Sequence, residues 1–222
     1  AALPLADMDA AVAEFRRARA LGLVGAILPV AGFESAATAE ELRPLLEAGN
    51  GTGAHFFIHP GRRPDQVPAG GTAPSVEPFA DNARHRRDLM VQSAVAHCMV
   101  TLLFTGLLAN YPNISLHVAN LGGTLPAVIE RMDNRTAEID PGAEPPSSRA
   151  GAVHVDCASL GPRAIEIAAH FFGTDRIVLG SDGPIFSAAK ALEAVANANI
   201  AETGKRAILD GNAERLLARV GG

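Results

Sequence analysis

Strand-like apolar runs alternate strictly with helical segments along this chain of 222 residues, and that order limits the possible folds more than any other feature. Short, nearly continuous apolar runs predict strands at about residues 23–28, 54–58, 114–119, 152–157 and 176–179. Helices are predicted at about residues 9–21, 38–48, 81–109 and 162–172, with another ending near 133 and two more starting near 187 and 205. Strands that are apolar on both faces are typical of a parallel sheet covered by helices. We therefore expect an α/β fold.

Five such strands fit either a doubly wound sheet or part of a (β/α)8 TIM-like barrel. No G-x-G-x-x-G or G-x-x-x-x-G-K sequence follows any of the strands, so the Rossmann and P-loop folds lose their main support. The barrel is favoured, although a complete barrel needs eight strands and about 250 residues. A proline-rich and glycine-rich stretch at about residues 60–80 is predicted to be an irregular loop, and loops of that length are usually functional or disordered.

Composition and charge exclude several kinds of partner. With 19 basic and 24 acidic residues, the net charge of −5 gives no electrostatic footprint for nucleic acid or for an anionic membrane. Cys98 and Cys157 are predicted to be free thiols in a reducing compartment, and no secretory signal opens the chain, so we expect a cytoplasmic protein. The stretch 89–109, which lacks charged residues, is interpreted as a buried helix rather than as a membrane span.

Polar side chains follow several of the predicted strands. His59, Asn120 and Asp182 stand at strand ends, with Asp156 near the end of the fourth strand. Ligand sites of parallel α/β folds lie beyond the carboxyl ends of the strands, where these groups could bind zinc or manganese or hold a carboxylic substrate. The alternative is that each residue only caps a strand or the next helix, as Asp182 could.

Side-chain alternation sorts the other histidines of the strands. His117 is three residues from Asn120, so we expect it on the opposite face, where it would pack against helices. His154 and Asp156 share a face and could chelate an ion together, although His154 would lie below the rim. His55 has the parity of His59 but begins its strand, far from the strand ends.

Several motifs resemble one known family. They are Phe-Thr-Gly at 104–106, Tyr-Pro at 111–112, ISLHVANLGGTLP at 114–126, FIHP at 57–60, VLGSDGP at 178–184 and GNAERLL at 211–217. Together, and in this order, they resemble the amidohydrolase-related family, which includes aminocarboxymuconate-semialdehyde decarboxylase and related decarboxylases, lactonases and hydratases. The resemblance implies a barrel with a divalent metal, usually zinc, and a homodimer. It makes His59 and Asp182 metal ligands and gives Asp182 a part in proton transfer.

The sequence departs from the family pattern at two places. The family carries an H-x-H metal pair on its first strand, whereas the first histidine here is His55. The resemblance therefore implies one barrel domain over residues 1–222 that lacks the first one to three β/α units. The family also has a histidine directly before its glycine turn, where this chain has Asn120, and an asparagine cannot shuttle a proton near neutral pH.

Three functions stay open on this basis. The first is a metal-dependent hydrolase or decarboxylase for a small carboxylated or cyclic acid, with Asp182 and Asn120 as catalytic residues, Asp156 at the substrate, and His59 and Asp182 on the metal. The second is a catalytically degenerate relative, without metal, that acts as a binding or assembly protein. The third keeps a metal through a rearranged set of His59, Asp156 and Asp182, with or without His154.

Overall fold

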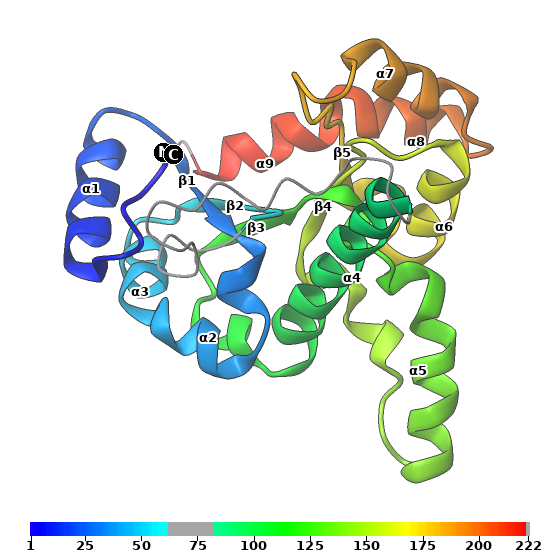
Figure 1. The fold of residues 1–222 in the computed structure, drawn as a ribbon, viewed down its shortest axis with the longest axis horizontal. Coiled ribbons are helices and arrows are strands. Elements are labelled where there is room, and N and C mark those ends of the chain that lie inside the picture. Colours follow the sequence, from blue (N-terminus) through cyan, green and yellow to red (C-terminus); the bar gives the residue numbers. More distant parts are fainter. Residues whose placement is uncertain (62–81, 221–222) are drawn as a thin grey trace.

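The strands form one parallel sheet whose order follows the chain. The computed structural model describes residues 1–61 and 82–220. Within these residues the sheet order is β1-β2-β3-β4-β5 (Figure 1), with β1 at Gly25–Pro29, β2 at His55–His59, β3 at Ser115–Val118, β4 at His154–Asp156 and β5 at Ile177–Val178. A doubly wound sheet reverses its strand order at a switch point, whereas a barrel wall does not. The barrel-like α/β class is confirmed.

One helix precedes the first strand of this sheet, and helices follow each of the strands. The first, α1, runs over Met8–Ala20, with the Asp7 side chain accepting from the backbone N–H of Ala10 at 3.0 Å as its N-cap. The other α-helices are α2 (Ala36–Glu41), α3 (Arg43–Gly51), α4 (Ala83–Phe104), α5 (Leu125–Ile139), α6 (Pro162–Phe172), α7 (Ala188–Asn197), α8 (Glu202–Arg206) and α9 (Asn212–Val220). Short 3-10 or π turns are η1 (Val30–Phe33), η4 (Leu107–Asn110), η5 (Asn120–Gly122), η6 (Pro146–Ala152), η7 (Thr174–Arg176) and η8 (Ala207–Gly211).

Several of the predicted helices differ from the observed ones, and α5, predicted to end near residue 133, runs to Ile139. The helix predicted at 38–48 is divided into α2 and α3, because Pro44 occupies the first turn of α3 and cannot continue an earlier helix. The helix predicted at 81–109 ends at Phe104, since Gly106 adopts a φ of 78° and directly precedes η4. Most of the loop predicted at 60–80 lies outside the described residues.

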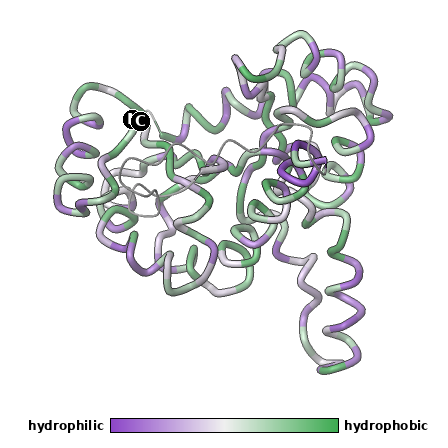
Figure 2. The backbone as a smooth tube through the Cα atoms, viewed as in Figure 1, coloured by the Kyte–Doolittle hydropathy of each residue, from purple (hydrophilic) through white to green (hydrophobic). Residues whose placement is uncertain are grey.

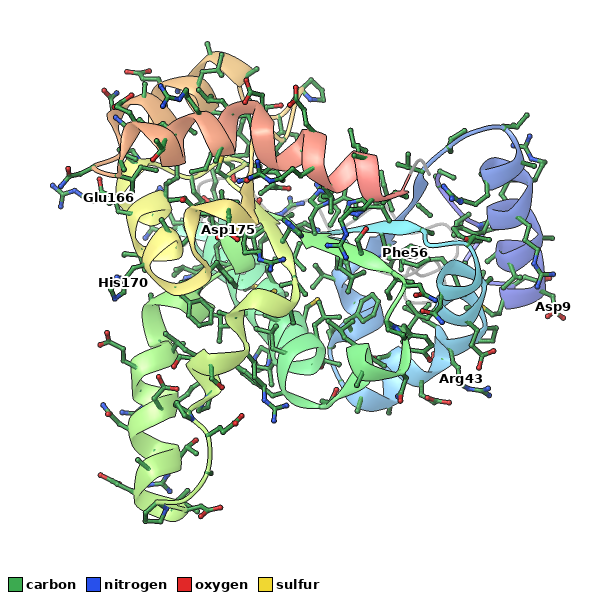
Figure 3. All side chains as sticks on the ribbon, turned by 180° about the vertical axis from the view of Figure 1, so that it is seen from behind. Asp9, Arg43, Phe56, Glu166, His170 and Asp175 are labelled. Atoms are coloured by element: carbon green, nitrogen blue, oxygen red, sulfur yellow. The ribbon has the colours of Figure 1, made fainter. Side chains whose placement is uncertain are left out.

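The two faces of the sheet differ in composition. Phe56 and Ile58 of β2 point to the helix-covered face, as do Leu116 and Val118 of β3, and all four are buried. Phe56 stacks on Phe15 of α1 with ring centroids 5.6 Å apart, and Figure 3 places Phe56 inside the molecule, whereas Asp9 and Arg43 lie on its outside. The opposite face carries His55, Phe57 and His59 of β2 beside Ser115 and His117 of β3.

One helix stands apart from the rest. Figure 1 shows α5 projecting away from the sheet, and Figure 2 shows hydrophilic residues along much of it. Its buried residues are Leu125 and Ile129, both in its first turns. The projecting part of α5 therefore adds little to the core. None of the helices in residues 1–61 and 82–220 is long and apolar enough to cross a bilayer.

Candidate active site

His59 and Asp182 meet at the carboxyl ends of the strands although 123 positions separate them in the sequence. His59 is the last residue of β2, and Asp182 lies in the loop after β5. The Nε2 atom of His59 is 3.4 Å from Oδ1 of Asp182, and the two side chains are 38% and 19% exposed. A ligand can therefore reach both side chains.

The second ring nitrogen of His59 restricts what lies between these two groups. Nδ1 is 3.0 Å from the carbonyl oxygen of Pro60, which can only accept, so Nδ1 carries a proton. In the neutral imidazole the Nε2 lone pair then faces a carboxylate oxygen, and two acceptors repel unless a proton or a cation lies between them. Histidines that bind metals usually donate their other N–H in this way.

The spacing of the two groups also suits one ion. Two ligands about 2.1 Å from a tetrahedral ion lie about 3.4 Å apart. His59 and Asp182 thus fit as two ligands of a divalent cation. Within the described residues, however, no group of three or more His, Cys, Asp or Glu side chains is arranged to hold a metal. The rearranged ligand set that includes Asp156 is therefore not assembled in this structure.

The backbone holds Asp182 in an unusual conformation. Its φ is 54°, and its carbonyl oxygen accepts from the N–H groups of Ile185 at 3.0 Å and Phe186 at 3.2 Å. The next helix, α7, begins at Ala188 and has Ser187 at its N-cap position. Asp182 therefore does not cap that helix, and the helix-capping alternative for this residue is wrong.

Asp156 ties together two of the loops at the strand ends. It is the last residue of β4 and is buried, with 3% of its surface exposed. Its Oδ1 accepts from the backbone N–H groups of Asn120 at 3.1 Å and of Ala158 at 3.0 Å. Burial raises the pKa of the Asp156 carboxyl to about 6, against the effect of these two hydrogen bonds.

Asn120 occupies a turn that the sequence pattern did not resolve. The four residues Asn120, Leu121, Gly122 and Gly123 have φ values of 58°, 53°, 73° and 66°. A Cβ on Gly123 would lie 2.2 Å from the backbone oxygen of Gln92 in α4, so only glycine allows this close approach. The buried Asn120 thus sits in a left-handed turn pressed against α4.

His117 lies on the face of the sheet that carries His59, and the expectation that it packs against helices is wrong. Its ring stacks on Phe57 at 4.0 Å between centroids, and its Nε2 is 3.8 Å from Oδ2 of Asp156. The parity argument counted alternation from His117 to Asn120, but β3 ends at Val118 and alternation does not continue into a left-handed turn.

A second histidine is joined to His117. The Nε2 of His55 is 2.7 Å from Nδ1 of His117, and the Nδ1 of His55 is 2.9 Å from the hydroxyl of Ser115. Burial lowers the pKa of His55 to about 4 and that of His117 to about 3, so both rings are neutral near pH 7. A partial signal for this cluster was present in the amino-acid pattern, since His55 shares the parity of His59, but the pairing with β3 requires the strand register.

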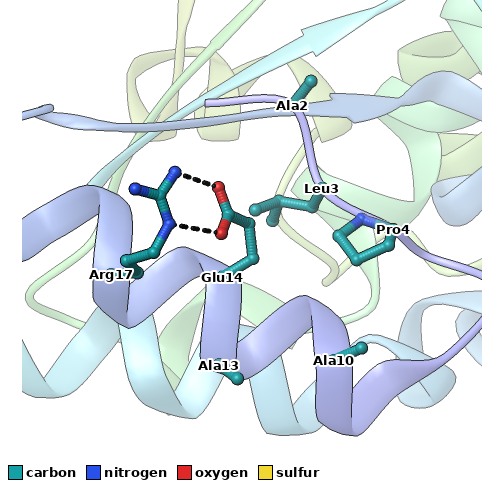
Figure 4. A pocket seen from close by; sticks show the side chains of 7 residues that line it. All are labelled: Ala2, Leu3, Pro4, Ala10, Ala13, Glu14 and Arg17. Carbon is teal, nitrogen blue, oxygen red and sulfur yellow. Dashed lines mark hydrogen bonds and ion pairs between the residues drawn. The ribbon is translucent and has the colours of Figure 1, made fainter.

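The surface also has two depressions, one distant from these groups and one beside the loop of Asp182. The one in Figure 4 lies between the N-terminal segment and α1, where Arg17 and Glu14 pair with each other through bonds of 2.7 and 2.8 Å. A second, of about 290 Å³, lies between the start of α6 and α7 and includes Ser181 and Lys190 in its lining. The first has no free charge to offer a ligand, whereas the second adjoins the loop of Asp182.

Comparison with known proteins links this fold to decarboxylases. The chain is 28% identical over 171 residues to gamma-resorcylate decarboxylase of Rhodococcus jostii, covering 67% of this chain and 46% of that protein. The chain thus spans less than half the length of this relative.

Solved structures share the fold at low identity. A 2,6-dihydroxybenzoate decarboxylase in complex with 2,6-dihydroxybenzoate aligns with a TM-score of 0.72 at 22% identity, over 98% of this chain and 69% of that one. A dihydroxybenzoic acid decarboxylase from a Polaromonas species, solved with manganese and 2-nitroresorcinol, aligns with a TM-score of 0.71 at 21% identity, over 98% and 68%.

A family model confirms the resemblance seen in the motifs. The model described as amidohydrolase matches residues 1–219, which is nearly the whole chain. The sequential order of the parallel strands agrees with that assignment. The chain belongs to the amidohydrolase family.

Proposed function

We propose that this chain carries the His59–Asp182 half of the active site of a metal-dependent decarboxylase whose substrate is a small aromatic carboxylic acid. The observation that carries the proposal is the acceptor pair at 3.4 Å, His59 Nε2 and Asp182 Oδ1, which needs a cation or a proton between its members. The relatives favour decarboxylation over hydrolysis, because those named above are decarboxylases, and one of them is solved with 2,6-dihydroxybenzoate. Manganese in one related structure supports a divalent ion, and zinc is the second candidate.

Loss of carbon dioxide from an aromatic acid leaves an electron pair on the ring carbon, and that carbon must take up a proton. A divalent ion at His59 and Asp182 would supply positive charge for the oxygens of the substrate. Asp182 is the side chain that we assign to hold or deliver the proton, because it is partly exposed beside that position. Asn120 can orient an oxygen by hydrogen bonding, and we keep Asp156 as the neighbouring substrate-side carboxyl.

Metal binding and carbon dioxide release from 2,6-dihydroxybenzoate test this proposal separately. Calorimetry with Mn²⁺ and with Zn²⁺ should detect one ion per chain, and both Asp182→Asn and His59→Gln should weaken its binding at least tenfold. Asp182→Asn should lower carbon dioxide release by roughly 10²–10⁴-fold. The matched controls are Asp175→Asn at the other end of β5 and His170→Gln on the outside of α6, which should change neither quantity. Metal binding that is unchanged in both Asp182→Asn and His59→Gln would refute the assignment.

Asn120 favours a second candidate, a non-catalytic relative that binds a small acid. A general acid or base typically contributes about 10²–10⁴-fold, and an amide cannot replace it. The backbone at position 120 accepts a histidine, since histidine is among the residues enriched at positive φ. If the natural chain shows no turnover and Asn120→His creates it, the chain is a degenerate enzyme. If neither turns over and both bind 2,6-dihydroxybenzoate, it is a binding protein.

A further inference from the structure

A chain of polar side chains crosses three strands and ends at the buried carboxylate of Asp156. Ser115, His55 and His117 are linked in order by contacts of 2.9 and 2.7 Å, and His117 faces Asp156 at 3.8 Å. Two parallel stacks fix the ring planes, because His117 lies 7° from the plane of His55 and 8° from that of Phe57. None of these three polar residues belongs to the His59–Asp182 pair.

The two oxygens of Asp156 have different surroundings. Oδ1 accepts both backbone bonds, from Asn120 and Ala158, whereas Oδ2 faces Nε2 of His117. The separation of 3.8 Å is longer than a hydrogen bond, and a small rotation of either side chain would bring the two atoms within hydrogen-bond distance. His117 is thus the side chain placed to satisfy the second oxygen of the carboxylate.

The hydrogen positions follow from the two ends of this row of side chains, the Ser115 hydroxyl and the Asp156 carboxylate. A neutral imidazole has one donor and one acceptor nitrogen. If the Asp156 carboxylate accepts from Nε2 of His117, then Nδ1 of His117 must accept, and Nε2 of His55 must donate to it. Nδ1 of His55 is then the acceptor for the Ser115 hydroxyl. Every group donates toward Asp156, and no other assignment of the two rings supplies that carboxylate.

We propose that His117 is a positioning residue for Asp156, held in its Nε2–H tautomer by the hydrogen bond that its Nδ1 accepts from His55. Through Asp156 it fixes the backbone of Asn120 and Ala158, and so the two loops that flank the site at the strand ends. This role goes beyond the proposed decarboxylase function, because it concerns how the loops are held and not which substrate they meet. It applies equally to an enzyme and to a binding protein.

The nitrogen spectrum of the histidines tests the tautomers directly. In chain labelled with ¹⁵N-histidine at pH 7.5, long-range proton–nitrogen correlation should show both His55 and His117 neutral and protonated at Nε2. A proton on Nδ1 of His117, or a charged ring, would overturn the proposal. The Ser115→Ala variant should leave His55 as the Nε2–H tautomer, since its donation to His117 persists.

Substitutions at position 117 separate a hydrogen-bonding role from packing. A glutamine places its amide nitrogen near the position of Nε2, whereas an asparagine reaches only as far as Nδ1, and a phenylalanine keeps the stack on Phe57. We expect His117→Gln to keep amide hydrogen exchange at Asn120 and Ala158 slow. His117→Asn and His117→Phe should accelerate it about tenfold or more, as for the loss of a hydrogen bond to a charged group.

The matched control is His154→Gln. His154 pairs in register with His117 on the next strand and lies on the same face, yet it is outside the hydrogen-bonded chain of Ser115, His55 and His117. Its replacement should leave exchange at Asn120 and Ala158 unchanged. If His117→Phe protects these amides as well as His117→Gln does, the ring acts by packing alone and the proposal fails. None of these readouts requires turnover or a bound metal, so they stand apart from the test of the proposed function.

Discussion

The two faces of the same five-stranded sheet are built for different purposes. In β2, Phe56 and Ile58 are fully buried under helices, whereas His55, Phe57 and His59 lie on the opposite face. In β2 and β3 the helix-covered face is apolar, and the opposite face carries His55, His59 and His117. One face therefore supplies stability, and the other supplies chemistry and the hydrogen bonds that position it.

On the polar face, the exposure of the histidines increases towards the carboxyl ends of the strands. His59 is partly exposed at the strand ends, whereas His55 and His117 are more deeply placed and have pKa values lowered by burial. A ligand can reach His59, whereas His55 and His117 form hydrogen bonds inside the protein. The following predictions test this division, beginning with the largest expected effect.

Substitutions at two neighbouring phenylalanines of β2, Phe56 and Phe57, compare most directly how much each face contributes to stability. Phe56→Ala should cost about 3–5 kcal/mol of unfolding free energy, because it empties a buried site against Phe15. Phe57→Ala, on the partly exposed face, should cost less than half as much. Urea unfolding followed by circular dichroism measures both. Equal losses would show that the two faces do not differ in their contribution to stability.

Gly180 tests how tightly the strand ends are packed around Asp156. A Cβ at this position would lie 2.9 Å from both Cβ and Cγ of Asp156. Gly180→Ala should therefore cost up to about 3 kcal/mol through overpacking. Gly161→Ala is the control, since a Cβ there meets nothing within 4 Å. Similar urea midpoints for the two variants would contradict the close packing.

Acid should destabilise the fold through the buried histidines. His117, which faces His55, His154, His59 and Asp156, binds its proton less tightly when folded than when unfolded, so stability falls as the pH drops from about 6.5 towards 3. Through this single group, the free energy of unfolding is about 2 kcal/mol lower at pH 5 than at pH 8. Asp156 acts in the opposite direction between its ordinary pKa and about 6, because its folded pKa is raised.

Unfolding of His117→Gln across pH 4–8 measures this contribution. The variant should lose stability less steeply below pH 6.5 than the natural chain does. His170→Gln, on the outside of α6, should retain the steep loss. If the unfolding free energy of His117→Gln falls with pH as steeply as that of the natural chain, His117 does not resist protonation in the folded state.

The smallest effect is expected at the left-handed turn. Asn120 has a φ of 58°, which asparagine and glycine accept more readily than alanine does. Asn120→Ala should lower the unfolding free energy by about 1 kcal/mol, and Asn120→Gly should stay close to the natural chain. Thermal unfolding distinguishes the two. A larger loss with glycine than with alanine would show that the side chain, and not the backbone, matters for stability.

The amino-acid sequence by itself determined the α/β class, the sequential strands and the residues at the strand ends. Apolar runs and helix signals are local properties, so the bounds of α1 and α6 agree with prediction to within one residue, and His59 and Asp182 could be selected from motifs. The division of 38–48 into two helices was also encoded locally, by Pro44, and was missed.

Tertiary structure alone decided which side chains meet. The face occupied by His117 depends on where β3 ends and on the left-handed turn after it, and neither follows from alternation. The contacts of His117 with His55 and Asp156 join residues that are 62 and 39 positions away, through a strand register that only the paired backbones define. Hydrogen bonding across strands is a property of spatial neighbours, and a linear pattern carries no information about it until the sheet has formed.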